Sequence, residues 1–408
     1  MTHATETGVQ RAVSAQHILI VFHDFSAGGT EIIALKLARE WVKSGRKVTI
    51  LCGTYDGPLW SKVPNGVDVV ALSPEIGRSL LSRLELRRRI PAAIDRIAPD
   101  LAFLPGNFHL ILAGAIRKTK SQPVVVAKIS NPLSPPGRFG IVQRLTSLAF
   151  RKAARDVDWL VAMSSGLMAE ARATTRSDAI SVIFDPNVGD QSRQTRARSI
   201  ASSGDPIRLL AAGRLVPQKD FALAIRIVAE LSQTHDVQLT ILGEGPGRAQ
   251  LERLAKRLGV EARVAMPGYA ASIIPALAKS DLLLVTSRYE GGPAVAVEAL
   301  EQGVPVITTD CSHFLRDLLS DPACGKILAT RDARKFATAI LAFIQPDQRQ
   351  HFTPSTVTNP YRNAVAAENY LHLFDRLMQK LTRWPVTATV ETFDQALSGD
   401  DCLGHVEI

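Results

Sequence analysis

The chain alternates short apolar runs with longer amphipathic segments, and the alternation occurs in both halves. The apolar runs lie at 17–22, 47–52, 100–104, 123–129 and 159–164 in the first half, and at 207–213, 238–243, 262–268, 281–287 and 305–309 in the second. Because they are continuously apolar, they predict strands buried on both faces, as in parallel sheets covered by helices. Between them, segments such as 223–235 and 248–260 carry apolar residues at helical spacing. The pattern predicts an α/β fold with two doubly wound domains.

Polar stretches mark the expected domain boundaries. Residues 185–206 are rich in Ser and Arg and have no periodicity, which predicts a linker with a disordered insert. Residues 359–381 predict a long amphipathic helix, whereas the residues after Trp384 include five acids and no base. We therefore expect a first domain over 1–190, a second over 191–360, a helix over 361–383, and a poorly ordered acidic tail over 384–408.

Length and composition fit an intracellular globular protein. The 408 residues are 46% hydrophobic and 21% charged, which is enough for two sizeable cores. The first residues lack the apolar segment of a secretory signal, and no apolar window is long enough to span a membrane. The four cysteines are scattered without metal-type spacing. These features predict a cytoplasmic protein with reduced thiols, no disulfide framework and no zinc site.

The net charge of +9 is unevenly distributed, and residues 76–155 contain fifteen Lys and Arg but only three acids. Such a region suits phosphate groups, anionic lipid headgroups or nucleic acid, or is simply a solvated basic face. No basic patch is interleaved with aromatic residues, which argues against nucleic acid. The amphipathic run 137–155 fits either docking on an anionic membrane surface or an ordinary core-packing helix.

Four stretches combine glycines with charged residues directly after predicted strands, where ligands bind in open α/β sheets. Gly28 and Gly29 precede a predicted helix and fit either a phosphate site at its N-terminus or a plain loop. Arg214 and Lys219 follow the strand at 207–213. They suit the two phosphates of a diphosphate, with two surface bases as the alternative.

Glycines also follow the strand at 238–243. Gly243, Gly245 and Gly247 give the spacing G-x-G-x-G, which differs from the dinucleotide fingerprint G-x-G-x-x-G. An NAD-binding role is therefore disfavoured. We expect these glycines to shape a turn and to seat a nucleotide base above the following helix.

Glu290 and Glu298 lie eight residues apart, on either side of the pair Gly291 and Gly292. Glycoside hydrolases need their two carboxylates about 5–9.5 Å apart. Eight residues of helical rise give roughly 12 Å, which better suits two grips on one extended ligand. We expect Glu298 to accept hydrogen bonds from ribose hydroxyls and Glu290 to approach a transferred sugar, while the glycine amides add donors.

One histidine ends a predicted strand in the first half. His109 follows the run 100–104 and could face the cleft, touching the sugar or the leaving phosphate. A structural role for a lone histidine is equally compatible with the pattern.

Together these stretches resemble the family-4 glycosyltransferases, also described as group 1, which are retaining enzymes of the GT-B fold. The resemblance is carried by Gly-Gly at 28–29, "GRLVPQKD" at 213–220, "GEGPGRAQLERLAKRLGV" at 243–260 and "SRYEGGPAVAVEALEQGVPVI" at 287–307. The last stretch contains the Glu-x7-Glu signature. The sequence departs from the family at Asp185, where asparagine is frequent, at 308–319, which lacks the usual glycine-rich segment, and at 103–109, which is not the common histidine-rich strand end.

The resemblance implies two facing Rossmann-like domains, with a C-terminal helix returning to the first domain. It implies a nucleotide-sugar donor held mainly by the second domain, an acceptor held mainly by the first, and no divalent metal. Carried over residue by residue, it implies a diphosphate clamp of Arg214 and Lys219, a ribose contact by Glu298, a sugar contact by Glu290, a backbone donor at Gly29 and a sugar-facing histidine at His109.

We therefore expect a retaining, metal-independent hexosyltransferase without a cofactor, acting from a nucleoside-diphosphate sugar on an acceptor hydroxyl. The expected acceptor is a glycan or lipid-linked glycan of a bacterial-type surface polysaccharide pathway, reached from the cytoplasm and with peripheral contact to the membrane. The alternatives are a nucleotide-sugar epimerase or sugar phosphorylase on the same fold, or a non-catalytic nucleic-acid-binding protein.

Overall fold

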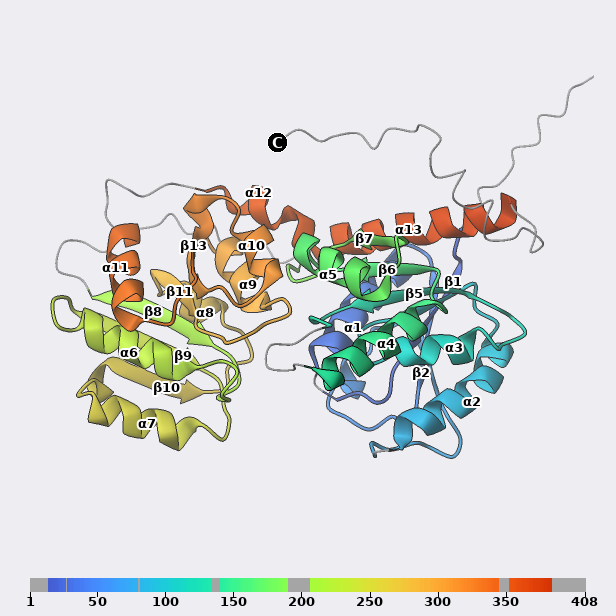
Figure 1. The fold of residues 1–408 in the computed structure, drawn as a ribbon, viewed down its shortest axis with the longest axis horizontal. Helices are drawn as coiled ribbons and strands as arrows, with labels where there is room; N and C mark the ends of the chain where they lie inside the picture. The colour runs from blue at the N-terminus through green and yellow to red at the C-terminus, as the bar shows by residue number, and fades with distance from the viewer. Residues whose placement is uncertain are drawn as a thin grey trace, which may run out of the picture.

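The computed structural model shows two α/β domains joined side by side (Figure 1). It describes residues 14–26, 28–79, 81–133, 140–189, 206–344 and 352–383. Most of the predicted insert in 185–206 and all of the acidic tail 384–408 lie outside the described residues.

The first domain is built on a parallel sheet of seven strands in the order β3-β2-β1-β4-β5-β6-β7. Its strands are β1 His17–Val21, β2 Lys47–Cys52, β3 Val67–Ala71, β4 Leu101–Leu104, β5 Val124–Ile129, β6 Trp159–Ala162 and β7 Ile180–Val182. The second domain has a parallel sheet of six strands in the order β10-β9-β8-β11-β12-β13. Its strands are β8 Ile207–Ala212, β9 Val237–Leu242, β10 Val264–Gly268, β11 Leu282–Val285, β12 Val306–Thr309 and β13 Gly325–Leu328.

Helices cover both faces of each sheet (Figure 1). Those of the first domain are α1 Gly29–Lys43, α2 Ser82–Ile97, α3 Ala113–Ile116, α4 Ile141–Ala154 and α5 Ser165–Thr175. Those that follow are α6 Phe221–Leu231, α7 Arg248–Arg257, α8 Ile274–Leu277, α9 Ala294–Glu301, α10 His313–Leu318, α11 Ala333–Ile344, α12 Pro354–Thr358 and α13 Asn363–Arg383. Among the described residues, no helix is both long and apolar enough to cross a lipid bilayer.

Every strand predicted from an apolar run is present, and the structure has three further strands that were not predicted. The additional strands β3, β7 and β13 all lie at a sheet edge. Edge strands have a neighbour on one side only, so they tolerate polar residues and short lengths. In β3 Asp68 interrupts the run and four of five residues are half-buried, while β7 and β13 span only three and four residues.

The chain crosses between the domains twice, and the two crossings are bonded to each other. The backbone amides of Asn187 and Val188 donate to Tyr361 O, both at 2.9 Å, and Asn363 donates back to Val188 O at 2.9 Å. At the first crossing Asp185 forms a buried ion pair with Lys128 of β5 at 2.5 Å. Asp185, which stands where asparagine is frequent in the family, therefore has a buried lysine as its counter-charge.

Helix α13 returns to the first domain and completes its core, as the resemblance implies. It runs along that domain in Figure 1 and packs on α1. Tyr370 and Phe374 contact the ring of Trp41 with centroids 6.0 and 5.3 Å apart, and Tyr370 also contacts Phe103 of β4 at 5.3 Å. All four rings are fully buried. The predicted fold of two facing Rossmann-like domains with a returning helix is confirmed.

Candidate active site

The strand order fixes where the candidate loops lie. In the first sheet the order reverses between β1 and β4, and in the second between β8 and β11. Ligands of doubly wound sheets bind at these switch points, outside the carboxyl ends of the strands. The stretches 24–30, 105–109, 213–219 and 286–292 follow these four strands. The topology therefore gathers the predicted residues at two sheet edges.

The two edges face each other across the domain boundary. A Cβ atom placed on Gly291, after β11, would lie 2.6 Å from Ser130 O and 2.8 Å from Asn131 Oδ1, both after β5. On the neighbouring side, Ser165 at the start of α5 donates to Asp317 of α10 from its amide at 2.7 Å and from its hydroxyl at 2.6 Å. The loop of the second domain that carries Glu290 and Gly291 thus lies against the first domain.

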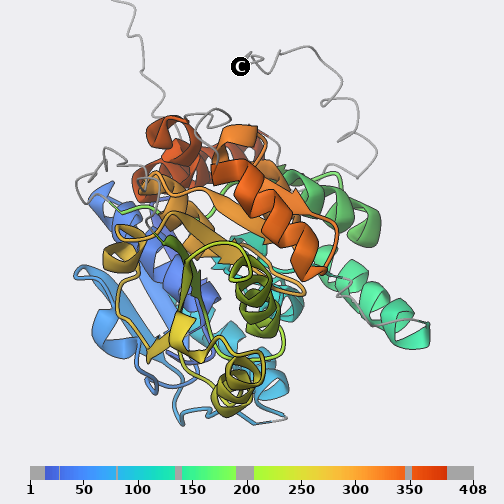
Figure 2. The ribbon, with the colours of Figure 1, turned by 90° about the vertical axis from the view of Figure 1, so that its left-hand side faces the viewer.

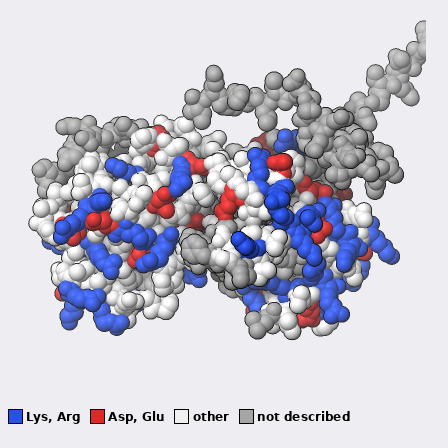
Figure 3. All heavy atoms as spheres, in the orientation of Figure 1, with Lys and Arg blue, Asp and Glu red and all other residues white. Residues whose placement is uncertain are grey.

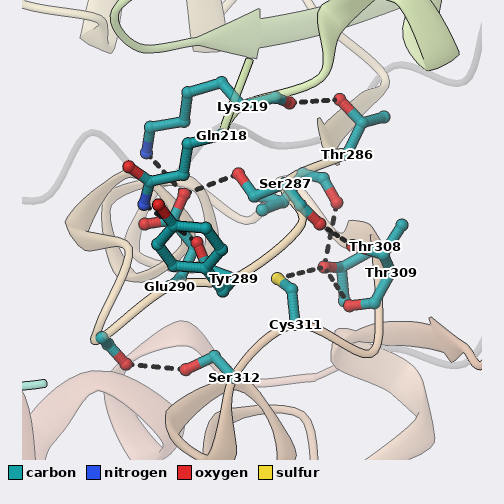
Figure 4. Close-up of polar contacts among 12 residues, drawn as sticks. Gln218, Lys219, Thr286, Ser287, Tyr289, Glu290, Thr308, Thr309, Cys311 and Ser312 are labelled. Carbon is teal, nitrogen blue, oxygen red and sulfur yellow. Dashed lines mark hydrogen bonds and ion pairs between the residues drawn. The ribbon is translucent and has the colours of Figure 1, made fainter. Parts of the chain in front are cut away.

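Lys219 and Glu290 form an ion pair at the second sheet edge (Figure 4). Lys219 Nζ lies 2.6 Å from Glu290 Oε1, which also accepts a hydrogen bond from Ser287 Oγ at 2.5 Å. The Glu290 side chain is 9% exposed and that of Lys219 is 20% exposed. A buried carboxylate stays charged only with such partners. The pair joins the loop after β8 to the loop after β11, although the residues lie 71 positions apart in the chain.

Backbone and hydroxyl hydrogen bonds hold this loop in place (Figure 4). The bonds are Glu290 N to Cys311 O at 2.8 Å, Ser312 Oγ to Gly291 O at 2.6 Å, Thr286 Oγ1 to Lys219 O at 3.0 Å, Thr309 Oγ1 to Ser287 O at 2.6 Å and Gln218 Nε2 to Tyr289 O at 2.9 Å. The loop carrying Glu290 is therefore held by the loop after β8 and by residues at and after the end of β12. Such preorganisation reduces the cost of orienting charges at a reacting centre.

Arg214 is placed differently from Lys219. Its side chain is exposed, and no hydrogen bond or ion pair ties it to any described residue. The two predicted clamp residues lie in one loop, yet only Lys219 is held in a fixed orientation. An unpaired guanidinium and a paired ammonium can still act on one diphosphate, since both are cations at the same strand end.

Glu298 lines a cleft between the domains of about 1330 Å³. The wall on its side includes Tyr269, whose ring is 79% exposed in the loop after β10, and the opposite wall includes Arg39 of α1. Burial raises the pKa of Glu298, and the nearby Lys36 of α1 opposes that rise. Lys36 also donates to Pro186 O at 3.0 Å at the first crossing. The sequence pattern did not single out Lys36, because a lysine on an amphipathic helix is typical of a surface position.

Gly28 immediately precedes α1 and Gly29 is its first residue, but an acid lies against Gly28. A Cβ atom on Gly28 would lie 2.1 Å from Glu31 Oε2, whereas Gly29 has open space around its Cβ position. Burial raises the pKa of Glu31, whose carboxylate also accepts from its own backbone amide. An anion at this helix end would therefore share the positive terminus with Glu31.

Gly243 and Gly245 have positive φ angles of 139° and 159°. A Cβ atom on Gly243 would lie 1.9 Å from Gly213 O, and one on Gly245 would lie 2.7 Å from Leu215 O. These glycines let the loop after β9 pack on the loop that carries Arg214. The predicted turn is present, and its contacts are with backbone.

His109 is buried at the edge of the first sheet. The ring is 3% exposed, and neither nitrogen has a hydrogen-bond partner in the described part of the chain. Burial, together with the charges of His23, Arg78 and Arg83, lowers the pKa of His109 to about 4. The ring lies edge-on to Phe108, with centroids 5.8 Å apart, and it does not line the cleft that contains Glu298.

The described residues contain no group of three or more His, Cys, Asp or Glu side chains placed to hold a metal ion. The expectation of metal-independent catalysis remains a prediction.

Two family models match the chain and together span most of it. The model described as "Glycosyltransferase Family 4" matches residues 27–185, and that described as "Glycosyl transferases group 1" matches residues 192–355. The first match covers the domain that includes Gly28 and His109, and the second covers the domain that includes Lys219 and both glutamates.

Curated relatives are glycosyltransferases. An uncharacterized glycosyltransferase of Methanocaldococcus jannaschii is 26% identical over 71% of this chain and 78% of its own length. The lipopolysaccharide core biosynthesis glycosyltransferase LpsE of Rhizobium meliloti is 30% identical over 42% of this chain, which spans about half (53%) of that relative. LpsD of the same organism is 28% identical over 74% of this chain and 83% of its own length.

Solved structures share the fold. The lipopolysaccharide outer core galactosyltransferase WaaB matches with a TM-score of 0.68 at 18% identity, over 90% of this chain and all (100%) of that one. Anabaena HepE in complex with UDP matches with a TM-score of 0.64 at 19% identity, over 93% of this chain and 100% of that one. The family matches and the fold agree: the chain belongs to the group 1, family 4 glycosyltransferases and has their GT-B fold.

Proposed function

We propose that the enzyme transfers a sugar from a nucleoside-diphosphate sugar to an acceptor hydroxyl, with retention of configuration and without a divalent metal. The observation that carries this proposal is the Lys219–Glu290 ion pair, in a hydrogen-bonded loop that faces the first domain. HepE, a structural neighbour, was crystallised with UDP and with UDP-glucose. That supports a uridine nucleotide as the first donor to test.

Charge development during transfer suggests a role for each side chain. As the glycosidic bond breaks, negative charge accumulates on the leaving diphosphate. Lys219 and Arg214 neutralise it, and Glu290 orients the ammonium of Lys219 while approaching the sugar. Glu298, with Lys36 nearby to offset its charge, accepts hydrogen bonds from ribose hydroxyls. The open space around Gly29 leaves room for the sugar at the N-terminus of α1.

The acceptor we propose is a glycan or lipid-linked glycan of a surface polysaccharide, reached from the cytoplasm. Relatives named for such pathways include LpsE and a diphospho-undecaprenol-linked N-acetylgalactosaminyltransferase of Campylobacter jejuni. Helix α4 adds support for peripheral membrane contact, because Leu145 and Leu148 are 60% and 56% exposed. Arg144 and Lys152 are exposed on the same helix. In Figure 2 α4 extends from the body of the molecule, and in Figure 3 Lys and Arg side chains gather over the first domain.

Donor and stereochemistry are tested with purified protein. UDP-, GDP- and ADP-sugars are screened for thermal stabilisation, and the stabilising donor is then assayed with and without EDTA. The anomeric configuration of the product is read by NMR. An inverted product contradicts retention, and loss of activity in EDTA contradicts metal independence. Epimerisation of the donor alone, or turnover that requires added phosphate, would identify the epimerase or phosphorylase alternative.

Membrane contact is tested by flotation with anionic and neutral vesicles. We expect the protein to float with anionic vesicles at low salt and the double variant Leu145→Ser/Leu148→Ser to stay in the soluble fraction. Equal flotation of both proteins with either vesicle contradicts docking through α4.

A further inference from the structure

A second, smaller pocket lies at the edge of the first sheet. It has a volume of about 290 Å³ and is lined by His23, Arg78, Ser79, Ser82, Arg83 and Phe108. Its walls come from the loop after β1, the segment before α2 with the first turn of α2, and the loop after β4. A pocket of this size holds a single sugar residue rather than a whole oligosaccharide or nucleotide.

His23 lines this pocket and has a buried ring nitrogen without a hydrogen-bond partner in the described chain. The residue is 3% exposed, its Nδ1 lies 3.1 Å from Asp24 Oδ2, and its buried Nε2 has no partner among the described residues. Burial alone raises the pKa of Asp24, but hydrogen bonds from Arg78 and Ser26 hold that pKa well below its ordinary value. Asp24 is therefore an acceptor, so the proton of the neutral imidazole lies on Nδ1. This tautomer leaves a lone pair on Nε2, which suits a hydroxyl donor.

Arg83 brings a cation without a counter-charge. Its guanidinium carbon lies 3.2 Å from the centroid of the Phe108 ring, and no acid of the described chain pairs with it. The other arginine, Arg78, is already neutralised by Asp24, with Nη2 2.9 Å from Oδ1. The remaining nearby acid, Glu31, interacts with Arg78. Of the two guanidinium groups in the pocket, Arg83 is the one available for an external anion.

We propose that this pocket recognises the acceptor through a sugar residue that bears an anionic group, phosphate or carboxylate, with Arg83 binding the anion and His23 Nε2 accepting a neighbouring hydroxyl. The hydroxyl of Ser79 adds a polar group at the exposed rim of the pocket. The inference rests on the proposed function, in which the first domain holds the acceptor.

A short series of contacts connects this pocket to the loop after β11, which carries Glu290 and Gly291. Asn107, next to Phe108, accepts from the amide of Ser130 at 2.7 Å and donates to Asn131 O at 2.8 Å. Ser130 and Asn131 are the residues against which Gly291 lies. An acceptor anchored at Arg83 is therefore held beside the sugar end of the donor site and outside the diphosphate clamp.

The test compares charged and neutral sugars by calorimetric titration. Glucose 6-phosphate, glucuronate and glucose are the probes, and every protein carries Arg214→Ala so that the diphosphate clamp does not bind the phosphate probe. We expect glucose 6-phosphate or glucuronate to bind about ten-fold or more tightly than glucose. Arg83→Ala should abolish this preference. Arg88→Ala, which removes an exposed arginine of the same helix outside the pocket, should retain it.

The result identifies the anion and separates the two proposals. Preference for the phosphate probe or for the carboxylate probe assigns the group. Equal affinity for charged and neutral sugars, or a preference that survives Arg83→Ala, overturns the inference. Parallel titrations with UDP, GDP and ADP of the protein without Arg214→Ala report the donor site alone. Failure to bind any nucleotide counts against the proposed function, whereas nucleotide binding without anion preference counts against only the pocket. Thermal melting confirms that each variant is folded.

Discussion

The carboxyl edges of the two sheets differ in how completely their polar groups are paired. At the second edge the carboxylate of Glu290 accepts from Lys219 and Ser287, and its backbone amide donates to Cys311 O. At the first edge His23 has one nitrogen and His109 two without partners in the described structure. At the second edge the polar groups of Glu290 are hydrogen-bonded within the protein, whereas the first edge has buried polar atoms without a partner in the described chain.

This difference fits a division of labour between the domains. Charged side chains that are already oriented suit a group that every donor substrate shares, such as the diphosphate leaving group. Unpaired buried groups are costly, so their presence indicates a site that is completed by a ligand. We infer that the second domain supplies the common chemistry of transfer and the first supplies the selection of the acceptor.

The largest expected effect sharpens the comparison within the second domain. Lys219→Ala should reduce turnover about 10²–10³-fold, because it removes a fixed cation from the departing diphosphate. It should also lower the free energy of unfolding by about 1–3 kcal/mol, because Glu290 loses a partner while staying buried. Arg214→Ala should impair turnover without that loss of stability, since Arg214 is exposed. Kinetics and urea unfolding measure the two quantities separately.

A control variant in the same domain is Arg253→Ala, which removes an exposed arginine on α7. It should change neither the turnover nor the free energy of unfolding. Activity within a few-fold of wild type for both Lys219→Ala and Arg214→Ala would contradict the clamp.

The next effect tests whether His109, at the edge of the first sheet, is neutral in the folded protein. The pKa of His109 is about 4 in the folded state, below its ordinary value of 6.5, so the unfolded state takes up the proton first as the pH falls. His109 therefore destabilises the fold progressively from pH 6.5 down to pH 4. Between pH 7 and pH 5 the contribution is about 2 kcal/mol. Urea unfolding of wild type and His109→Phe at pH 7 and pH 5 gives the loss of unfolding free energy in each protein. An equal loss in both proteins would contradict the prediction.

A smaller effect probes the approach of the two edges. Gly291→Ala places a methyl group 2.6 Å from Ser130 O, a backbone atom that cannot move aside without shifting the loop after β5. We expect the domains to open and turnover to fall about ten-fold. The matched variant Gly292→Ala meets the flexible end of Met163 at 2.6 Å and should leave the domain separation unchanged. Small-angle scattering compares the two, and an identical radius of gyration for Gly291→Ala and wild type contradicts the close approach.

The smallest effect concerns the hydrogen bonds between α5 and α10. Ser165→Ala removes one bond to Asp317 and leaves the amide bond in place, so it should cost about 0.5–1.5 kcal/mol in the contact between the domains. Asp317→Ala removes both bonds and should cost more. Thermal melting and scattering of the two variants rank the losses. Equal losses in the two variants would show that the amide bond contributes nothing to domain contact.

Sequence patterns predicted the buried strands and the loops that follow them, for a physical reason. A strand covered on both faces must be apolar throughout, and its carboxyl end then marks the site of ligand contacts. Edge strands such as β3 lack that constraint and were not predicted. The family resemblance implies for Glu290 and Glu298 the same roles that their spacing had already indicated.

Contacts between distant parts of the chain could not be read from the sequence. The sequence grouped Lys219 with Arg214, five positions away, whereas the fold pairs it with Glu290. Likewise Lys36 reaches Glu298 only because α1 and α9 face each other across the cleft. His23 and Arg83 carry no recognisable motif, since their pocket arises from three separate connections.

The return of α13 has a consequence for how this protein can be divided. The first domain is discontinuous along the chain, because Tyr370 and Phe374 complete the aromatic core around Trp41. A truncated protein that stops at Gly189 would expose Trp41 and Phe103 to water and should aggregate. An isolated first domain needs residues 363–383 appended, and a chimera that exchanges second domains must keep this helix with its original partner.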